Sequence, residues 1–112
     1  MLIYKILRAD EWEALLDLGE TDGAPIDVTD GYIHFSTAEQ VRETAAKHFA
    51  GEEDLMILCL ESATLGPALK WEPSRGGALF PHLYGKLRLE DVVWEENLRL
   101  EDGVHVFPED VA

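Results

Sequence analysis

Residues 55–60 read LMILCL, a continuous apolar run with an acidic residue on either side. A strand with one solvated face alternates apolar and polar residues, whereas an unbroken apolar run is typical of a strand covered on both faces. We therefore expect this segment to be a buried strand, with the other elements arranged around it.

Two further strands and two helices are expected before this run. MLIYKIL (1–7) alternates as a strand does, with Leu2, Tyr4 and Ile6 on one face and Ile3, Lys5 and Leu7 on the other. A helix is expected from Asp10, with Glu13 completing a capping box, to Gly19, followed by a polar loop over 20–31. GYIHFS (31–36) predicts a strand, and a second helix follows it from Thr37, capped with Gln40, to Gly51.

The elements after the run are less regular. ALKWE (68–72) predicts a short strand, VVWEENLRL (92–100) one strand or two short ones, and 101–112 an acidic, weakly patterned tail. Strands outnumber helices, and the two helices come early. The pattern indicates a single α+β domain over residues 1–112, with a mostly antiparallel or mixed sheet.

Composition excludes some classes of function. The chain of 112 residues is 46% hydrophobic and carries a formal net charge of −14, which disfavours bulk nucleic-acid or anionic-membrane binding. Its one cysteine, Cys59, lies inside the apolar run, so no disulfide within the chain is expected. No stretch approaches the roughly 20 apolar residues of a membrane-spanning helix. These features and an N-terminus without a signal-peptide pattern predict a cytoplasmic protein.

The strand GYIHFS places a titratable face beside the core. Alternation directs Ile33 and Phe35 inward and leaves Tyr32, His34 and Ser36 on the other face. This face is a candidate cleft wall. The alternative is a solvated sheet face on which the histidine is hydrogen-bonded.

A second histidine lies in GGALFPHLYG, residues 76–85. Gly76 and Gly77 allow backbone N–H groups to approach a ligand, Pro81 stiffens the chain before His82, and Tyr84 can stack or donate a hydrogen bond. The alternative is an ordinary structured loop.

The basic residues are concentrated around this loop. Four of the nine lie in the window 70–88, whose only acid is Glu72, so the window carries +3 and the other positions −17. They are Lys70, Arg75, Lys86 and Arg88. Such a window favours a small anionic ligand, with Arg75 gripping a phosphate or carboxylate. The alternative is that these cations balance acids on the surface.

Carboxylates near the two histidines are candidates for proton transfer. Glu72 could act as a general base or bind a sugar hydroxyl, or simply form a salt bridge with Arg75 or Lys70. Asp27 and Asp30 could orient His34 or cap a loop. The histidines lack the local spacing of a zinc site, so no metal site is predicted.

Three segments carry a family resemblance: IYKI (3–6), DGYIHFSTAEQV (30–41) and FPHLYG (80–85). Together they resemble an uncharacterised bacterial family known as domain of unknown function 952, over nearly the whole chain. The resemblance implies an ADP-ribosylation-like fold, a split mixed β core with flanking helices. It also implies that an NAD or ADP-ribose-like ligand is the cofactor to consider, with His34 at its ribose and Tyr84 as an aromatic clamp. Glu72 and Glu96 are then the candidates for a catalytic glutamate.

The sequence thus predicts a cleft for a nucleotide-like or phosphorylated anion, with possible ADP-ribosyl or NAD-related chemistry. Its lining residues would be His34, Ser36, Glu72, Arg75, Gly76, Gly77, His82 and Tyr84. Two alternatives stay open. One is a non-catalytic ligand-binding or sensing domain. The other is a two-histidine phosphoesterase-like hydrolase, because His34 and Ser36 fit its H-x-S/T pattern, although Tyr84 stands where the second copy needs serine or threonine. Whether the protein is an enzyme is left open.

Overall fold

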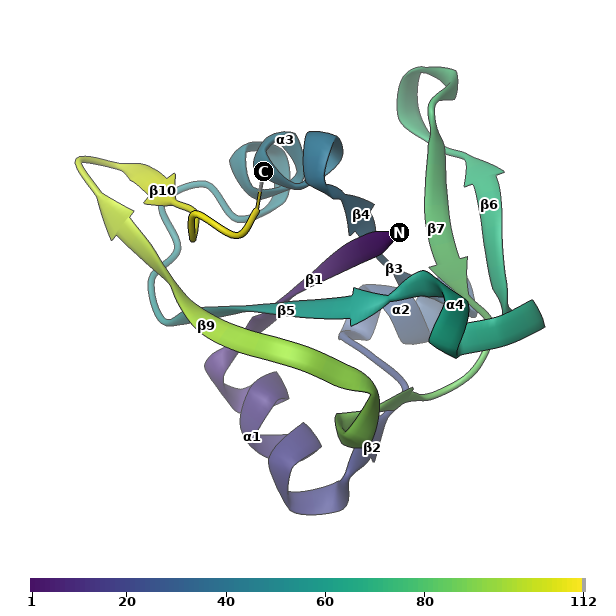
Figure 1. Ribbon diagram of the computed structural model, residues 1–112. Coiled ribbons are helices and arrows are strands. Elements are labelled where there is room, and N and C mark those ends of the chain that lie inside the picture. Colours follow the sequence, from purple (N-terminus) through teal and green to yellow (C-terminus); the bar gives the residue numbers. More distant parts are fainter. Residues whose placement is uncertain (112) are drawn as a thin grey trace.

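A curled five-stranded sheet forms the centre of the computed structural model, which describes residues 1–111 and, for Arg75, the backbone only (Figure 1). Its strand order is β10–β9–β5–β1–β4. The strands are β1 (Leu2–Arg8), β4 (Ser36–Thr37), β5 (Leu55–Glu61), β9 (Val92–Glu101) and β10 (Val104–Val106). The β5–β9 register shifts between Cys59 and Leu60, an irregularity of the kind that bends a strand and increases twist.

The run LMILCL forms β5, at the centre of this sheet, and both of its faces are buried. On one face Leu58 and Leu60 pack with Leu15 of helix α1 (Ala9–Leu18). On the other, Ile57 and Cys59 pack with Val41 of helix α3 (Ala38–His48). The prediction of a strand covered on both faces is confirmed.

A second, three-stranded sheet has the order β3–β7–β6 and projects beside the first (Figure 1). It contains β3 (Ile33–His34), β6 (Leu69–Pro73) and β7 (Leu79–Leu83). A two-stranded pair, β2 (Glu20–Thr21) with β8 (Leu87–Arg88), completes the strands of the described part.

The segment GYIHFS was predicted to form one strand. Instead it forms two short strands that connect the two larger sheets. β3 pairs with β7 and β4 pairs with β1, with Phe35 between them. The Phe35 N–H donates to the Pro81 carbonyl (2.9 Å), and its side chain is buried in the core. One short segment therefore fixes the position of one sheet relative to the other.

Strand direction corrects the expectation of a mixed β core, because every strand pair in the described residues is antiparallel. A continuous apolar run is common in parallel sheets, but burial on both faces is its physical cause, and two core clusters provide that here. The α+β class itself is confirmed.

The two predicted helices form near the expected positions, but α1 begins earlier and α3 ends earlier than predicted. Helix α1 starts at Ala9 rather than after Asp10, because Glu11, not Glu13, reaches back to accept from the Arg8 N–H (2.9 Å). Gly19 ends this helix in a left-handed conformation (φ 77°), as predicted.

Helix α3 has the predicted capping box at its start. The Gln40 N–H donates to the Thr37 hydroxyl (3.3 Å), and the Thr37 N–H donates to the Gln40 side chain (3.0 Å). The helix ends at His48, so Gly51 lies in the turn beyond it rather than at its cap.

The expectation of only two helices is wrong, because the loop over 20–31 contains a third, α2 (Pro25–Asp30). Proline at the first helical position and Gly31 after the last one were its sequence signals. A fourth, α4 (Ser62–Leu65), is a single turn, and short 3₁₀ segments cover Gly66–Ala68, Arg75–Gly77 and Leu89–Asp91.

The acidic C-terminal segment, over its described residues 101–111, joins the five-stranded sheet and the core. It contains β10, which pairs with β9, and Val111 is buried in the second core cluster. The Val111 carbonyl accepts from Arg42 of α3 (3.0 Å). Among the described helices, none is long and apolar enough to cross a membrane.

Candidate functional site

The outer face of the three-stranded sheet gathers five polar or aromatic side chains, which we call the histidine face: Tyr32, His34, Glu72, His82 and Tyr84. Its origin is the strand register. Ile33 faces Leu83 across β3 and β7, and both are buried in the core. The next pair, His34 with His82, therefore lies on the opposite face.

Glu72 joins His82 to Tyr84. Its Oε1 lies 2.8 Å from the His82 Nδ1 and accepts a hydrogen bond of 2.8 Å from the Tyr84 hydroxyl. The hydrogen bond with His82, followed by that from Tyr84, lowers the pKa of Glu72 below its ordinary value. The same bond to Glu72 raises the pKa of Tyr84. Glu72 is thus held as a carboxylate, half-exposed at the surface.

His34 lies between two carboxylates of α2. Its Nδ1 is 2.5 Å from the Asp27 Oδ1, and its Nε2 is 3.0 Å from the Asp30 Oδ2. Burial acts to raise the pKa of Asp27, but the hydrogen bonds from His34 and the charge of Lys5 outweigh it and lower that pKa to about 2. Asp27 therefore remains ionised although it is only 1% exposed.

Four aromatic rings are contiguous on this face. Tyr32 stacks on His82, with centroids 4.2 Å apart and planes 19° from parallel. It also lies 4.7 Å from His34 and 5.2 Å from Tyr84, and the two imidazoles meet edge to face at 5.4 Å. Tyr32 covers His82, which is 3% exposed, whereas Tyr84 is 41% exposed.

Of the residues predicted to form the site, the structure brings together His34, Glu72, His82 and Tyr84. Ser36 lies elsewhere: it is buried, and its hydroxyl is bonded to that of Thr44 in α3 (2.9 Å).

The glycines and the second glutamate also lie away from the histidine face. Gly76 and Gly77 form the turn between β6 and β7, with positive φ of 70° and 83°. Four residues separate Gly77 from His82, and β7 begins only at Leu79. Glu96 is exposed on β9, in the other sheet. The side chain of Arg75 lies outside the described part of the chain.

The basic window is largely neutralised in the described residues. Lys86 lies 3.0 Å from Asp22 and 3.8 Å from Glu20, and Arg88 lies 3.7 Å from Glu90. Lys86 and Arg88 therefore form ion pairs with surface acids, as the alternative interpretation of the basic window predicted. Lys70 differs, because it is the direct cross-strand partner of His82.

The sequence placed Tyr32 on the candidate cleft wall, on the His34 side of the strand, but Tyr32 was not among the predicted lining residues. For Asp27 the sequence left two roles open, orienting His34 or capping a loop. Asp27 does both tasks: it caps α2 by accepting from the Ala24 N–H (2.8 Å) and it also holds His34. Its contact with His34 depends on helix α2, which lies in the segment that was predicted to be a polar loop.

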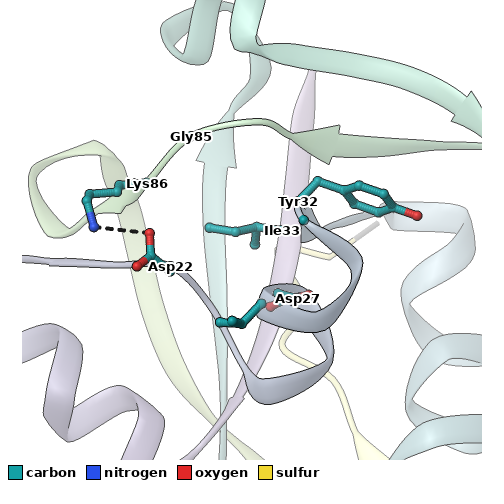
Figure 2. A pocket seen from close by; sticks show the side chains of 8 residues that line it. Asp22, Asp27, Tyr32, Ile33, Gly85 and Lys86 are labelled. Atoms are coloured by element: carbon teal, nitrogen blue, oxygen red, sulfur yellow. Dashed lines mark hydrogen bonds and ion pairs between the residues drawn. The ribbon is translucent and has the colours of Figure 1, made fainter.

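A pocket of about 270 Å³ lies beside α2 (Figure 2). Tyr32 is the one member of the histidine face that lines it, together with Asp27, and neither histidine of the face does so. The remaining lining residues are Asp22, Val28, Gly31, Ile33, Gly85 and Lys86. In Figure 2 the Tyr32 ring points away from the Lys86–Asp22 ion pair at the opposite side of the pocket. Within residues 1–111, no cluster of three or more histidine, cysteine or acidic side chains is placed to hold a metal ion.

Comparison with known proteins gives a family and a fold. The chain is similar to the crystal structure of protein CC0527 from Caulobacter crescentus, at 47% identity over 99% of this chain and 98% of that one, with a TM-score of 0.94. It is likewise similar to the solution NMR structure of CC0527, at 51% identity over 92% and 90% of the two chains, with a TM-score of 0.83.

No curated protein matches the sequence. The family model described as protein of unknown function (DUF952) matches residues 6–95, which is most of the chain. The chain therefore belongs to this family.

Proposed function

We propose that the protein binds a nucleotide-like ligand, of the class that includes ADP-ribose and NAD, on the histidine face. The observation that carries the proposal is the pair of histidine–carboxylate contacts, His34 with Asp27 and His82 with Glu72, set opposite each other on β3 and β7. Such pairs orient imidazoles for hydrogen bonding or proton transfer.

The aromatic rings support a ligand with a planar ring. Tyr84 and Tyr32 offer surfaces against which a base can stack, and stacking contributes about 1–3 kcal/mol per base in nucleic-acid-binding proteins. Because Tyr32 covers His82, the ligand either stacks on Tyr32 or displaces it to reach the imidazole. The Glu72 carboxylate, at the edge of these rings, is suited to accept from sugar hydroxyls.

Lys70 and His34 are the groups best suited to the charged part of such a ligand. Lys70 lies directly opposite His82 in the β6–β7 register. Gly76 and Gly77 lie in the turn at the end of the hairpin, and roles for them and for Arg75 in anion binding stay predictions.

ADP-ribosyl chemistry is the reaction class that we place first. It rests on the resemblance of the sequence to a family that is expected to share the fold of ADP-ribosylating enzymes. The α+β class agrees with that expectation, whereas the antiparallel pairing of the described strands differs from the mixed core that it implies. Glu72 is a better candidate than Glu96 for the catalytic glutamate, because it touches His82 and Tyr84. A carboxylate there would stabilise the positive charge that develops on a ribose ring as its bond to a base breaks.

Binding is tested by calorimetry and thermal shift with ADP-ribose, NAD and AMP. A ligand at about 100 times its Kd should add roughly 2.7 kcal/mol to the free energy of unfolding. His34→Ala and His82→Ala should abolish the shift, while His48→Ala, at the end of α3, should keep it. If none of these ligands binds, or if the His48 variant loses binding equally, the proposal is wrong.

Turnover is tested by nicotinamide release from NAD. Glu72→Gln should stop release while ADP-ribose still binds, and Glu96→Gln is the matched control that should remain active. Binding without release in the unmodified protein would favour the sensing alternative.

A two-histidine hydrolase is the second candidate, because the register makes His34 and His82 direct cross-strand partners. One imidazole would act as base and the other as acid on a phosphodiester. The test is hydrolysis of a cyclic nucleotide phosphodiester, whose rate should follow a bell-shaped pH profile and be lost in either histidine variant. Absence of hydrolysis excludes this candidate and leaves ligand binding intact.

A further inference from the structure

Beneath the histidine face lies a buried ion pair between Asp27 and Lys5, a lysine that the proposed function does not use. The Lys5 Nζ lies 2.8 Å from the Asp27 Oδ2, and the two side chains are 7% and 0% exposed. Removing two charges from water costs more than their attraction returns in many proteins, so fold stability alone does not account for such a pair.

Asp27 connects this ion pair to His34 through hydrogen bonds. One of its oxygens accepts from Lys5 and from the Ala24 N–H, and the other contacts the backbone N–H (3.1 Å) and ring Nδ1 (2.5 Å) of His34. Lys5 also donates to the His34 carbonyl (2.9 Å). The backbone and ring of His34 are thus fixed by the same two charged groups.

The chain at Gly23 passes very close to the Asp27 carboxylate. A Cβ atom built on Gly23 would lie 2.4 Å from the Asp27 Oδ2, so glycine is needed where this loop crosses the carboxylate. This close contact indicates that the position of Asp27 is fixed by the fold before any ligand arrives.

The other ring nitrogen of His34 points to a second, more accessible carboxylate. Its Nε2 lies 3.0 Å from Asp30, whose side chain is 36% exposed. Carboxylate oxygens accept hydrogen bonds and cannot donate them unless protonated. Two carboxylates, one at each nitrogen, therefore favour an imidazole ring that carries hydrogen on both.

We infer that Lys5 and Asp27 are positioning residues for His34, that Asp27 holds its ring as an imidazolium with the Nε2–H directed outward, and that Asp30 occupies the place of an anionic oxygen of the ligand. The ligand part of this inference rests on the proposed function, whereas the state of the ring does not. Asp30 is then a built-in competitor that the phosphate or carboxylate of a ligand must displace.

The charged and titratable groups around His34 come from four elements and the turn after α2. They are Lys5 of β1, Asp27 and Asp30 of α2, Tyr32, Glu72 of β6, and His82 of β7. Of these, Asp27 and Asp30 contact the His34 ring nitrogens, and Glu72 contacts the ring of His82 instead.

The state of the ring is tested first, without ligand, by nitrogen NMR of the imidazoles at about pH 7. Both ring nitrogens of His34 should show the signature of bound hydrogen. Asp27→Asn should convert the ring to a neutral form, whereas Lys5→Met, which removes a positive charge close to His34, should leave the ring protonated. A neutral His34 ring in the unmodified protein would overturn the inference, whether or not any ligand binds.

Displacement of Asp30 is tested by the Kd for ADP-ribose. Asp30→Asn removes the competing charge at an exposed position, so the protein should remain folded and bind a few-fold more tightly. Asp27→Asn should weaken binding about tenfold or more, because the bond to the ligand then loses its charge. Asp17→Asn, on exposed α1, is the control for net charge and should leave Kd unchanged.

The outcomes separate the two proposals. A doubly protonated His34 with no binding of ADP-ribose, NAD or AMP supports the positioning role and rejects the proposed function. Binding that Asp30→Asn weakens rejects Asp30 as a competitor while the proposed function stands.

Discussion

In the five-stranded sheet, β5 buries apolar side chains on both faces, whereas in the three-stranded sheet β7 buries Leu83 on one face and directs His82 to the other. The first sheet is held by apolar area removed from water. The second adds hydrogen bonds between ionisable groups on its outer face. The comparison teaches that the five-stranded sheet contributes most of the apolar burial, whereas the three-stranded sheet carries the candidate functional groups. Phe35 lies between β3 and β4, where the two sheets connect.

The largest expected effect is on the stability of the first sheet. Leu58→Ala removes a side chain that is fully buried against α1 and should lower the free energy of unfolding by about 2–5 kcal/mol. Leu79→Ala in β7 is the matched control, because Leu79 is 52% exposed, and it should cost far less. Urea unfolding measures both, and equal losses would contradict the division between the sheets.

A smaller loss of folding stability, electrostatic rather than hydrophobic in origin, should appear at acidic pH. The folded-state pKa of Asp27 is lowered from 3.8 to about 2, so its ionised form stabilises the fold above pH 3.8. That contribution, about 2 kcal/mol, should be lost as the pH falls from about 5 towards 2.

Urea unfolding across this range measures the loss. The double variant Lys5→Met/Asp27→Asn, which removes both charges together, should show a correspondingly shallower dependence on pH. An unchanged dependence would show that Asp27 is not the group responsible.

A substitution at the junction between the two sheets should lower the free energy of unfolding by less than either of the preceding changes. Thr37→Ala removes the side-chain cap of α3 directly after the segment that connects them, and should cost about 1 kcal/mol. Thermal or urea unfolding detects a change of this size. If Thr37→Ala also perturbs the ring resonances of His34 and His82, the two regions are coupled more tightly than we propose.

The smallest effect concerns one hydroxyl group. The bond to Glu72 raises the pKa of Tyr84, so Glu72→Gln should return it towards the ordinary value of a tyrosine. NMR titration of the Tyr84 ring at alkaline pH follows this change. Tyr4 serves as the internal control, because burial is the main cause of its raised pKa.

Sequence alone predicted the parts of the fold that depend on local pattern. The run at 55–60 specified a strand buried on both faces, and the alternation of residues 1–7 matches the two core clusters. The capping residues Thr37 and Gln40 marked the start of α3 correctly. Strand direction was predicted only as mostly antiparallel or mixed, because burial on both faces occurs in parallel and antiparallel sheets alike.

The candidate site was predictable only in part, because its residues meet through register rather than spacing. Nothing local in the sequence states that His34 faces His82, or that Glu72 reaches Tyr84. The sequence did not decide between the two roles of Asp27, because its helix lies in a segment of turn-forming residues. Gly76 and Gly77 have a structural reason of their own, since a tight turn needs residues that adopt positive φ.

The most direct test of the central claim, a ligand site on the histidine face, is an NMR titration of the imidazole rings with ADP-ribose. The resonances of His34 and His82 should move together and saturate, while those of His48 on α3 and His105 on β10 stay in place. Saturable shifts at His48 or His105 alone, or no shift at any histidine, would contradict the account.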